Sequence, residues 1–472
     1  MLTLTSYGAA DGVTGSCHLL EIANTWRVLL DCGIFQGRRS ERDRNQPPFP
    51  FDPSSIDALV VSHAHLDHIG RIPLLYKEGF RGRILSTRAT YDLARISMLD
   101  SARIMDSDAT RANRRRAPDE PLATPLYDEQ DVLDVIDMWQ DTVGYHQALT
   151  IEDALEVTMH DAGHILGSAF LELDCEIGAK RAKLLFSGDL GNVDKPIIQD
   201  PNRPPEADFV LMESTYGNRD HRPFEASREE LVTIVRETIE NQGNVLIPSF
   251  AMERSQELLY VLHDAIVAGK IPQHATIYLD SPMAIDATRI FTRHPDCYDA
   301  ETVQLAKDGL NPFQFKNLHY TRHTQDSMRI NDHRSGAIII AGSGMLTGGR
   351  ILHHIKHNIH RPECALIFCG YQAEGTLGRR MLQGANEVRI YGNSYPVHLQ
   401  LHTINGFSGH AGQQTLTQWA EHTRAPHIAL VHGEQDVKQT FASHLATSTS
   451  AARQIDIMPF AKPLDLSHLL HS

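Results

Sequence analysis

The sequence has few cysteines, and their spacing excludes two common roles. Six cysteines are scattered over 472 residues, and no two of them form a C-x-x-C pair. This spacing argues against a zinc site built on thiolates and against a disulfide framework. Free thiols are typical of a reducing compartment, so we expect a cytoplasmic protein.

Long apolar runs are also absent. No stretch reaches the roughly 18 apolar residues that a membrane-spanning helix needs, so we expect no membrane association. The N-terminal residues lack a basic start followed by an apolar block, and therefore predict no secretory signal.

Positive charge is in short supply, with 44 Lys and Arg against 59 Asp and Glu and a formal net charge of -15. This balance is unfavourable for binding nucleic acid, unless bound divalent cations offset it or the positive charge is local. The one dense basic run, Arg111–Arg116, is more typical of a solvated helix end than of a phosphate-binding patch. Its role stays open.

The length of the chain favours two domains rather than one core. Residues 1–217 alternate short apolar strands with loops and helices, whereas residues 218–393 show a parallel strand–helix alternation with its own apolar core. Near Asn393 the pattern changes again, and residues 394–472 begin with an alternation typical of an antiparallel strand. We therefore expect an α/β protein in which residues 218–393 are inserted into a domain formed by residues 1–217 and 394–472.

The densest group of coordinating side chains lies in "SHAHLDHIG", directly after an apolar strand. Neutral imidazole nitrogens and carboxylate oxygens are ligands that zinc prefers. His63 and His65 alternate on the turn and can point the same way. Asp67 and His68 open the following helix and face a second point. The segment therefore predicts ligands for two metal ions rather than one.

Three further candidate ligands follow apolar strands elsewhere in the chain. His164 lies between glycines in "DAGHILGSA", Asp189 in "LLFSGDLG", and His432 in "ALVHGE". Each alone would be weak evidence, but buried strands of α/β folds often present chemistry at their ends. A carboxylate such as that of Asp189 can also bridge two cations.

Six motifs of the chain occur in the order seen in metallo-β-lactamase-fold nucleases of the β-CASP family: "SHAHLDHIG", "AGHILGSA", "FSGDLG", "ESTYG", "FSGHA" and "LVHGE". The chain most resembles the RNA-processing branch, which includes the cleavage subunit of the pre-messenger-RNA 3′-end machinery and its prokaryotic relatives. The resemblance implies an αββα sandwich with an inserted β-CASP domain, a parallel sheet flanked by helices. It also implies two Zn²⁺ ions, and the choice of Zn²⁺ over the alternative cation Mn²⁺ rests on the ligand types.

The resemblance also implies a role for each candidate residue. One zinc would be held by His63, His65, His164 and Asp189, and the other by Asp67, His68, Asp189 and His432. Asp31, after the strand "RVLLD", matches the family's first acidic motif and would support the ligands without touching a metal.

The same family pattern implies a catalytic proton relay. Asp67 would accept a proton from the attacking water, His410 would protonate the leaving 3′ oxygen, and Glu213 would orient His410. The chain departs from the pattern at Gly409 and Gly412, where alanine and aspartate are common. Neither change removes a ligand, and the second removes an aspartate that can support that loop.

A histidine at position 432 favours RNA over DNA by resemblance, and we expect single-stranded RNA as substrate. Ser343, in a Gly-rich turn, and Arg254 and Arg379 are candidate phosphate contacts, although a plain turn and surface arginines are the simpler interpretations. The resemblance also guides the expectation of a homodimer.

Three other functions compete with a zinc-dependent ribonuclease. A DNA nuclease is disfavoured by His432. A small-molecule hydrolase acting on thioesters or lactones would need neither an inserted domain nor the pair Glu213 and His410. An inactive scaffold of an RNA-processing complex would be expected to lose ligands, and all seven are present.

Overall fold

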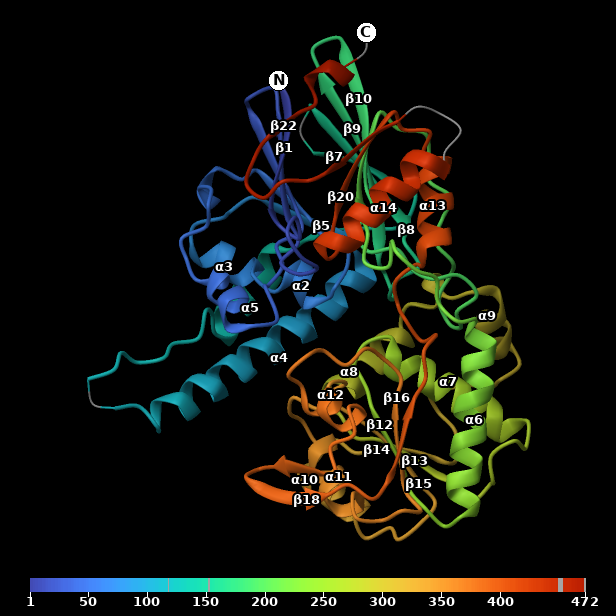
Figure 1. The fold of residues 1–472 in the computed structure, drawn as a ribbon. Coiled ribbons are helices and arrows are strands. Elements are labelled where there is room, and N and C mark those ends of the chain that lie inside the picture. The colour runs from blue at the N-terminus through green and yellow to red at the C-terminus, as the bar shows by residue number, and fades with distance from the viewer. Residues whose placement is uncertain (118, 152, 449–452, 471–472) are drawn as a thin grey trace. The chain divides into compact units, whose positions relative to one another are not determined.

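The computed structural model describes residues 1–117, 119–151, 153–448 and 453–470 (Figure 1). The chain divides into two compact units. Unit 1 contains Met1–Val193, Asp200–Asp220 and His410–Ser472, and unit 2 contains Asp194–Gln199 and His221–Gly409. The sequence-based boundaries after residues 217 and 393 lie before those that the structure places after Asp220 and Gly409.

The first sheet of unit 1 is antiparallel at one edge and parallel at the other. β1 pairs antiparallel with β22 and β2, and β2 pairs antiparallel with β3, whereas β3 to β6 run parallel. The strand order is β22 (Leu464–Asp465), β1 (Leu2–Gly8), β2 (Cys17–Ile22), β3 (Trp26–Leu30), β4 (Ala58–Val60), β5 (Arg83–Thr87) and β6 (Asp141–Val143).

The second sheet of unit 1 has the same mixed character. β10, β11, β20 and β21 run parallel, whereas β7 to β10 pair antiparallel. The strand order is β21 (Gln454–Ile457), β20 (His427–Val431), β11 (Phe209–Glu213), β10 (Lys180–Phe186), β9 (Ala169–Ile177), β8 (Leu155–Asp161) and β7 (Ala148–Ile151).

One apolar core lies between the two sheets, because inward-facing residues such as Leu4 of the first and Leu211 of the second belong to the same buried cluster. Trp419 and Phe441 lie on two helices that pack on the outer face of the second sheet. Figure 1 shows the other helices of the unit along the first sheet. The αββα sandwich expected from the sequence is confirmed. Its helices are α1 (Arg39–Arg42), α2 (Leu66–Ile69), α3 (Ile72–Lys77), α4 (Arg88–Asn113), α5 (Glu129–Met138), α13 (Gln413–His422) and α14 (Gln435–Ser448).

Four strands of unit 1 end one to three residues before a candidate site residue. β3 ends at Leu30, next to Asp31, and β20 ends at Val431, next to His432. β4 ends at Val60, three residues before His63, and β10 ends at Phe186, three residues before Asp189. Since neighbouring parallel strands end at a common edge, this topology gathers residues that are far apart in the sequence.

Unit 2 is built on a six-stranded, fully parallel sheet with helices between its strands. Its strand order is β14 (Leu318–Tyr320), β13 (Thr276–Leu279), β15 (Ala337–Ala341), β12 (Val245–Pro248), β16 (Ala365–Phe368) and β19 (Gln400–Thr403). The helices are α6 (Phe224–Glu240), α7 (Arg254–Val267), α8 (Pro282–Phe291), α9 (Ala300–Lys307), α10 (Thr324–Ile330), α11 (Ile351–Asn358) and α12 (Leu377–Leu382). A separate hairpin joins β17 (Glu387–Ile390) to β18 (Asn393–Pro396).

The segment after Asn393 corrects one expectation. β18 is antiparallel within its hairpin, but β19 pairs parallel with β16 at the edge of the unit 2 sheet. The prediction of an antiparallel strand belonging to the first domain was therefore wrong for β19. An edge strand is covered on fewer sides than a central one, so its polar and apolar residues can alternate as they do in an antiparallel strand. No helix within the described ranges is long and apolar enough to cross a membrane.

The core of unit 2 should be sensitive to cavities. Leu246 in β12 is fully buried, so Leu246→Ala should lower the free energy of unfolding by about 2–5 kcal/mol. Val267 at the end of α7 is 59% exposed, so Val267→Ala should change it by less than about 0.5 kcal/mol. Chemical denaturation of the intact protein, followed by circular dichroism, measures both. Equal losses in the two variants would contradict this description of the core.

Candidate metal centre

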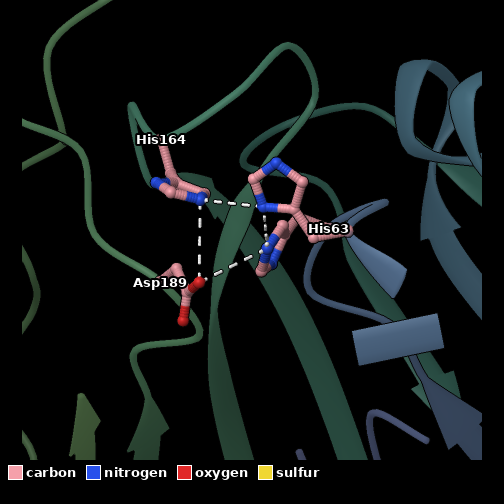
Figure 2. Close-up of side chains that lie close together, drawn as sticks. His63, His164 and Asp189 are labelled. Atoms are coloured by element: carbon pink, nitrogen blue, oxygen red, sulfur yellow. Dashed lines mark hydrogen bonds and ion pairs between the residues drawn. The ribbon is translucent and has the colours of Figure 1, made fainter. Parts of the chain in front are cut away.

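The first cluster of the centre joins three histidines and one aspartate from three loops. His63 Nε2 and His164 Nε2 each lie 3.1 Å from His65 Nδ1. The same two atoms lie 3.5 and 3.6 Å from Asp189 Oδ2. Figure 2 shows His63, His164 and Asp189 converging on a common point. Four donor atoms this close together form one potential metal site, and all four are predicted residues.

The second cluster adjoins the first through the other oxygen of Asp189. His68 Nε2 lies 3.2 Å from His432 Nε2, which lies 3.6 Å from Asp67 Oδ2. Asp189 Oδ1 lies 3.4 Å from His68 Nε2 and 3.5 Å from His432 Nδ1. The carboxylate of Asp189 therefore faces both clusters, as a bridging ligand would.

Two glycines allow the ligand-bearing loops to approach so closely. A Cβ atom at Gly33 would lie 1.5 Å from the carbonyl oxygen of Asp67, and one at Gly191 would lie 1.6 Å from that of Gly163, next to His164. Any side chain at either position would push a ligand loop away, so the geometry requires glycine there.

Asp31 orients His68 from behind the cluster. Asp31 Oδ2 lies 2.7 Å from His68 Nδ1, and its carboxylate also accepts hydrogen bonds from the backbone N–H and the hydroxyl of Ser62, both at 2.8 Å. Because Nδ1 is engaged, Nε2 of His68 is directed toward the second cluster.

Two hydroxyl residues were missed by the sequence analysis. Ser62 Oγ lies 3.1 Å from His63 Nδ1, and Thr215 Oγ1 lies 3.1 Å from His432 Nδ1. Thr215 also donates a hydrogen bond to the carbonyl oxygen of His432. Ser62 adjoins the predicted ligand His63, which was the available signal, whereas Thr215 adjoins no predicted ligand in the sequence.

The pair Glu213 and His410 lies beside the first cluster. His410 Nδ1 is 3.3 Å from Glu213 Oε1 and 3.9 Å from Asp189 Oδ2. The fully buried carboxylate of Glu213 is held by the backbone N–H groups of Leu190 and Thr215, at 2.6 and 3.2 Å. Burial disfavours the charged form of His410, but Glu213 and Asp189 outweigh it and raise its pKa to about 9.

The electrostatics of the clusters suit a divalent cation. Burial lowers the pKa of His63 well below its ordinary value and that of His65 to about 4, so both rings are neutral near pH 7. Burial opposes ionisation of Asp189, but His432 and His68 outweigh it and hold its pKa well below the usual range. Asp189 Oδ1 is buried without a hydrogen-bond partner among the described residues. Neutral imidazoles around an incompletely satisfied carboxylate are a donor set that fits zinc.

The predicted phosphate contacts all lie in unit 2, apart from these clusters in the sequence. The Ser343 hydroxyl accepts the backbone N–H of Thr347 at 2.9 Å, inside its own turn. Arg379 is exposed on α12. Arg254 is largely buried and bonds to other groups of the protein.

The basic run Arg111–Arg116 lies in unit 1, at and just beyond the end of α4. Arg111 forms an exposed ion pair with Asp108 at 3.6 Å. This position agrees with a solvated helix end.

Comparison with known proteins agrees with this geometry. Three family models match: a metallo-beta-lactamase superfamily domain over residues 19–180, a Beta-Casp domain over residues 255–381, and a Zn-dependent metallo-hydrolase RNA specificity domain over residues 394–457. The chain is 41% identical to "Ribonuclease TTHA0252" of Thermus thermophilus, over 92% of this chain and 94% of that protein. The chain belongs to the metallo-β-lactamase-fold β-CASP nuclease family. It is therefore a metal-dependent nuclease of the RNA-processing branch, as the resemblance predicted.

Proteins with a different name are also similar to the chain. The chain is 34% identical to "Transcription termination factor FttA" of Pyrococcus abyssi, over 96% of this chain and 71% of that protein. It is 34% identical to the protein of the same name from Methanocaldococcus jannaschii, over 92% of this chain and 67% of that protein.

The role of Asp31 can be tested by metal affinity. Asp31→Asn should weaken zinc binding at the second cluster by about 10–100-fold, because His68 loses the carboxylate that orients its ring. Competition with a chromogenic chelator measures this on the intact nuclease. Asp436→Asn changes an exposed residue on α14 and should leave the zinc affinity of both clusters unchanged. If the two variants bound zinc equally well, Asp31 would have no supporting role.

Proposed function

We propose that this nuclease is a ribonuclease that uses two zinc ions to hydrolyse phosphodiester bonds, leaving a 5′-phosphate and a 3′-hydroxyl. The observation that carries the proposal is the grouping of two ligand clusters and the pair Glu213 and His410 around one buried carboxylate, that of Asp189. Two cations sharing a carboxylate are typical of enzymes that transfer or hydrolyse phosphate esters.

Each cluster would hold one cation. The first ion would be bound by His63, His65, His164 and Asp189, and the second by Asp67, His68, Asp189 and His432. Bound there, the cations would neutralise charge on the phosphate and lower the pKa of the attacking water.

The protein's own groups move the protons. A carboxylate oxygen of Asp67 accepts the proton that the attacking water loses. His410 donates a proton to the leaving 3′ oxygen, which would otherwise depart as an unstable alkoxide. Glu213 engages Nδ1 of His410 and stabilises its protonated form, which leaves Nε2 as the proton donor.

Three observations favour RNA over the alternatives. His432 is the residue that resemblance associates with RNA-acting members, the match over residues 394–457 is to an RNA specificity domain, and one relative is named a ribonuclease. A DNA nuclease would share the same ligands, and a small-molecule hydrolase would need neither unit 2 nor His410. Single-stranded RNA as substrate, a homodimer, a cytoplasmic location and Mn²⁺ as the alternative cation stay predictions.

A direct assay separates these activities. The purified protein should cleave labelled single-stranded RNA, and activity should fall below detection after chelation and return on adding Zn²⁺, because the phosphate loses its counter-charge without a cation. End-group analysis should find 5′-phosphate and 3′-hydroxyl termini. Faster cleavage of matched single-stranded DNA would contradict the choice of RNA, and chelator-resistant cleavage would contradict the metal mechanism.

The proton-donor role of His410 predicts a selective loss. His410→Ala should lower kcat on RNA by about 10²–10⁴-fold. It should lower it much less on an oligonucleotide with sulfur in place of the leaving 3′ oxygen, because a thiolate departs without a proton. Zinc content, measured by elemental analysis, should stay unchanged. His146→Ala, at an exposed histidine outside the three groups described above, is the control. Cleavage of RNA by His410→Ala at the parent rate would exclude this role.

A further inference from the structure

Arg254, at the first position of α7, bonds to three other groups of unit 2. Its Nε lies 3.1 Å from Glu257 Oε2, and its two terminal nitrogens donate hydrogen bonds to the carbonyl oxygens of Cys369 and Phe407. The Arg254 side chain is only 12% exposed and that of Glu257 is fully buried. A planar guanidinium is suited to this task, because it presents several N–H donors in a fixed fork. The function described above assigns this arrangement no role.

One of these contacts lies on the segment that leads directly into His410. Around Phe407 the chain is held to unit 2 repeatedly: the Ile404 N–H donates to the carbonyl oxygen of Phe368 at 2.9 Å, and the Ser227 hydroxyl donates to that of Asn405. The Phe407 ring is fully buried and lies 5.3 Å from the Phe224 ring. Arg254 therefore holds a point of unit 2 that lies three residues before His410 in the sequence.

The other oxygen of Glu257 holds a second segment that leads away from the metal centre. Lys195, whose side chain is 2% exposed, forms an ion pair with Glu257 Oε1. Lys195 belongs to Asp194–Gln199, the short part of unit 2 that follows Asp189 in the sequence. The same segment bonds to unit 2 through its backbone, where the Asp299 N–H donates to the carbonyl oxygen of Ile197 at 2.9 Å. One buried carboxylate thus pairs with Lys195, six residues after Asp189, and with Arg254, which bonds to Phe407 three residues before His410.

We propose that Arg254, fixed by Glu257, is a positioning residue that sets the place of the general acid His410 through the carbonyl oxygen of Phe407. The proposal rests on the proposed function, since it needs His410 to be a proton donor. Proton transfer is sensitive to the separation of donor and acceptor, and a shift of about 1 Å can cost on the order of 10²-fold in rate. A loosened Phe407 carbonyl would displace His410 without removing any metal ligand.

The test compares two substrates, RNA and the oligonucleotide with a sulfur leaving group. Arg254→Ala should lower kcat on RNA by about 10–100-fold but lower it far less on the sulfur substrate, with KM and zinc content unchanged. Combining Arg254→Ala with His410→Ala should add little to the loss from His410→Ala alone, since both act on one step. If Arg254→Ala does not fold, Arg254→Lys keeps the charge beside Glu257 but loses the fork, and should show the same substrate-selective loss.

The matched control is Arg361→Ala. Arg361 also forms an ion pair with a glutamate of unit 2, Glu363, at 2.9 Å, and donates a hydrogen bond to a backbone carbonyl oxygen, that of Arg334. Neither partner belongs to residues 194–199 or 404–409. Arg361→Ala should leave the ratio of the two rates at the parent value. Equal losses on both substrates for Arg254→Ala and Arg254→Lys would overturn the proposal and make Arg254 merely structural. If His410→Ala cleaved RNA as fast as the parent protein, His410 would not be the proton donor, and the proposed function would be refuted instead.

Discussion

The metal centre depends on one buried carboxylate that has imidazoles on both sides. Asp189 Oδ2 lies 3.5 Å from His63 Nε2, and Oδ1 lies 3.4 Å from His68 Nε2. A buried carboxylate needs positive charge nearby, and in the chain alone His68 supplies part of it: burial disfavours its charged form, but Asp189 and Asp31 hold its pKa well above the ordinary value. A metal ligand must be a neutral imidazole, so a cation and a proton compete for Nε2 of His68. The site is thus built to exchange protons for cations.

Such a site has to be held in place against its own strain. Asp31 and His432 have positive φ angles of 59° and 50°, a conformation that costs a non-glycine residue on the order of 1–3 kcal/mol. Hydrogen bonds to neighbouring loops keep both in place, since the Asp31 N–H donates to the carbonyl oxygen of Val60 at 3.0 Å and the His432 N–H to that of Ala9 at 2.7 Å. The strained backbone aims both side chains at the second cluster, so the sandwich stabilises a geometry that the local sequence disfavours.

The sequence predicted the parts of this arrangement that are local. His63 to His68 lie in one motif, and strand ends before Asp189 and His432 follow from apolar runs that stop at polar residues. The pairing of β19 escaped prediction, because an edge strand of a parallel sheet can alternate like an antiparallel one. The roles of Thr215 and Arg254 escaped it too. Their partners are a distant ring and backbone carbonyl oxygens, which carry no signature in the sequence.

Arg254 illustrates why residue type alone misleads. An arginine in a nuclease suggests a phosphate contact, yet the guanidinium is satisfied by Glu257 and two carbonyl oxygens, and moving it to a phosphate would leave that carboxylate buried and without this partner. The cost of breaking a buried pair favours a fixed role over a mobile one. The two carbonyl oxygens belong to Cys369 and Phe407, far from Arg254 in the sequence, so the contact joins three passages of unit 2 at one point. A rigid junction at Phe407 limits the freedom of the residues that follow, and His410 lies three residues beyond it.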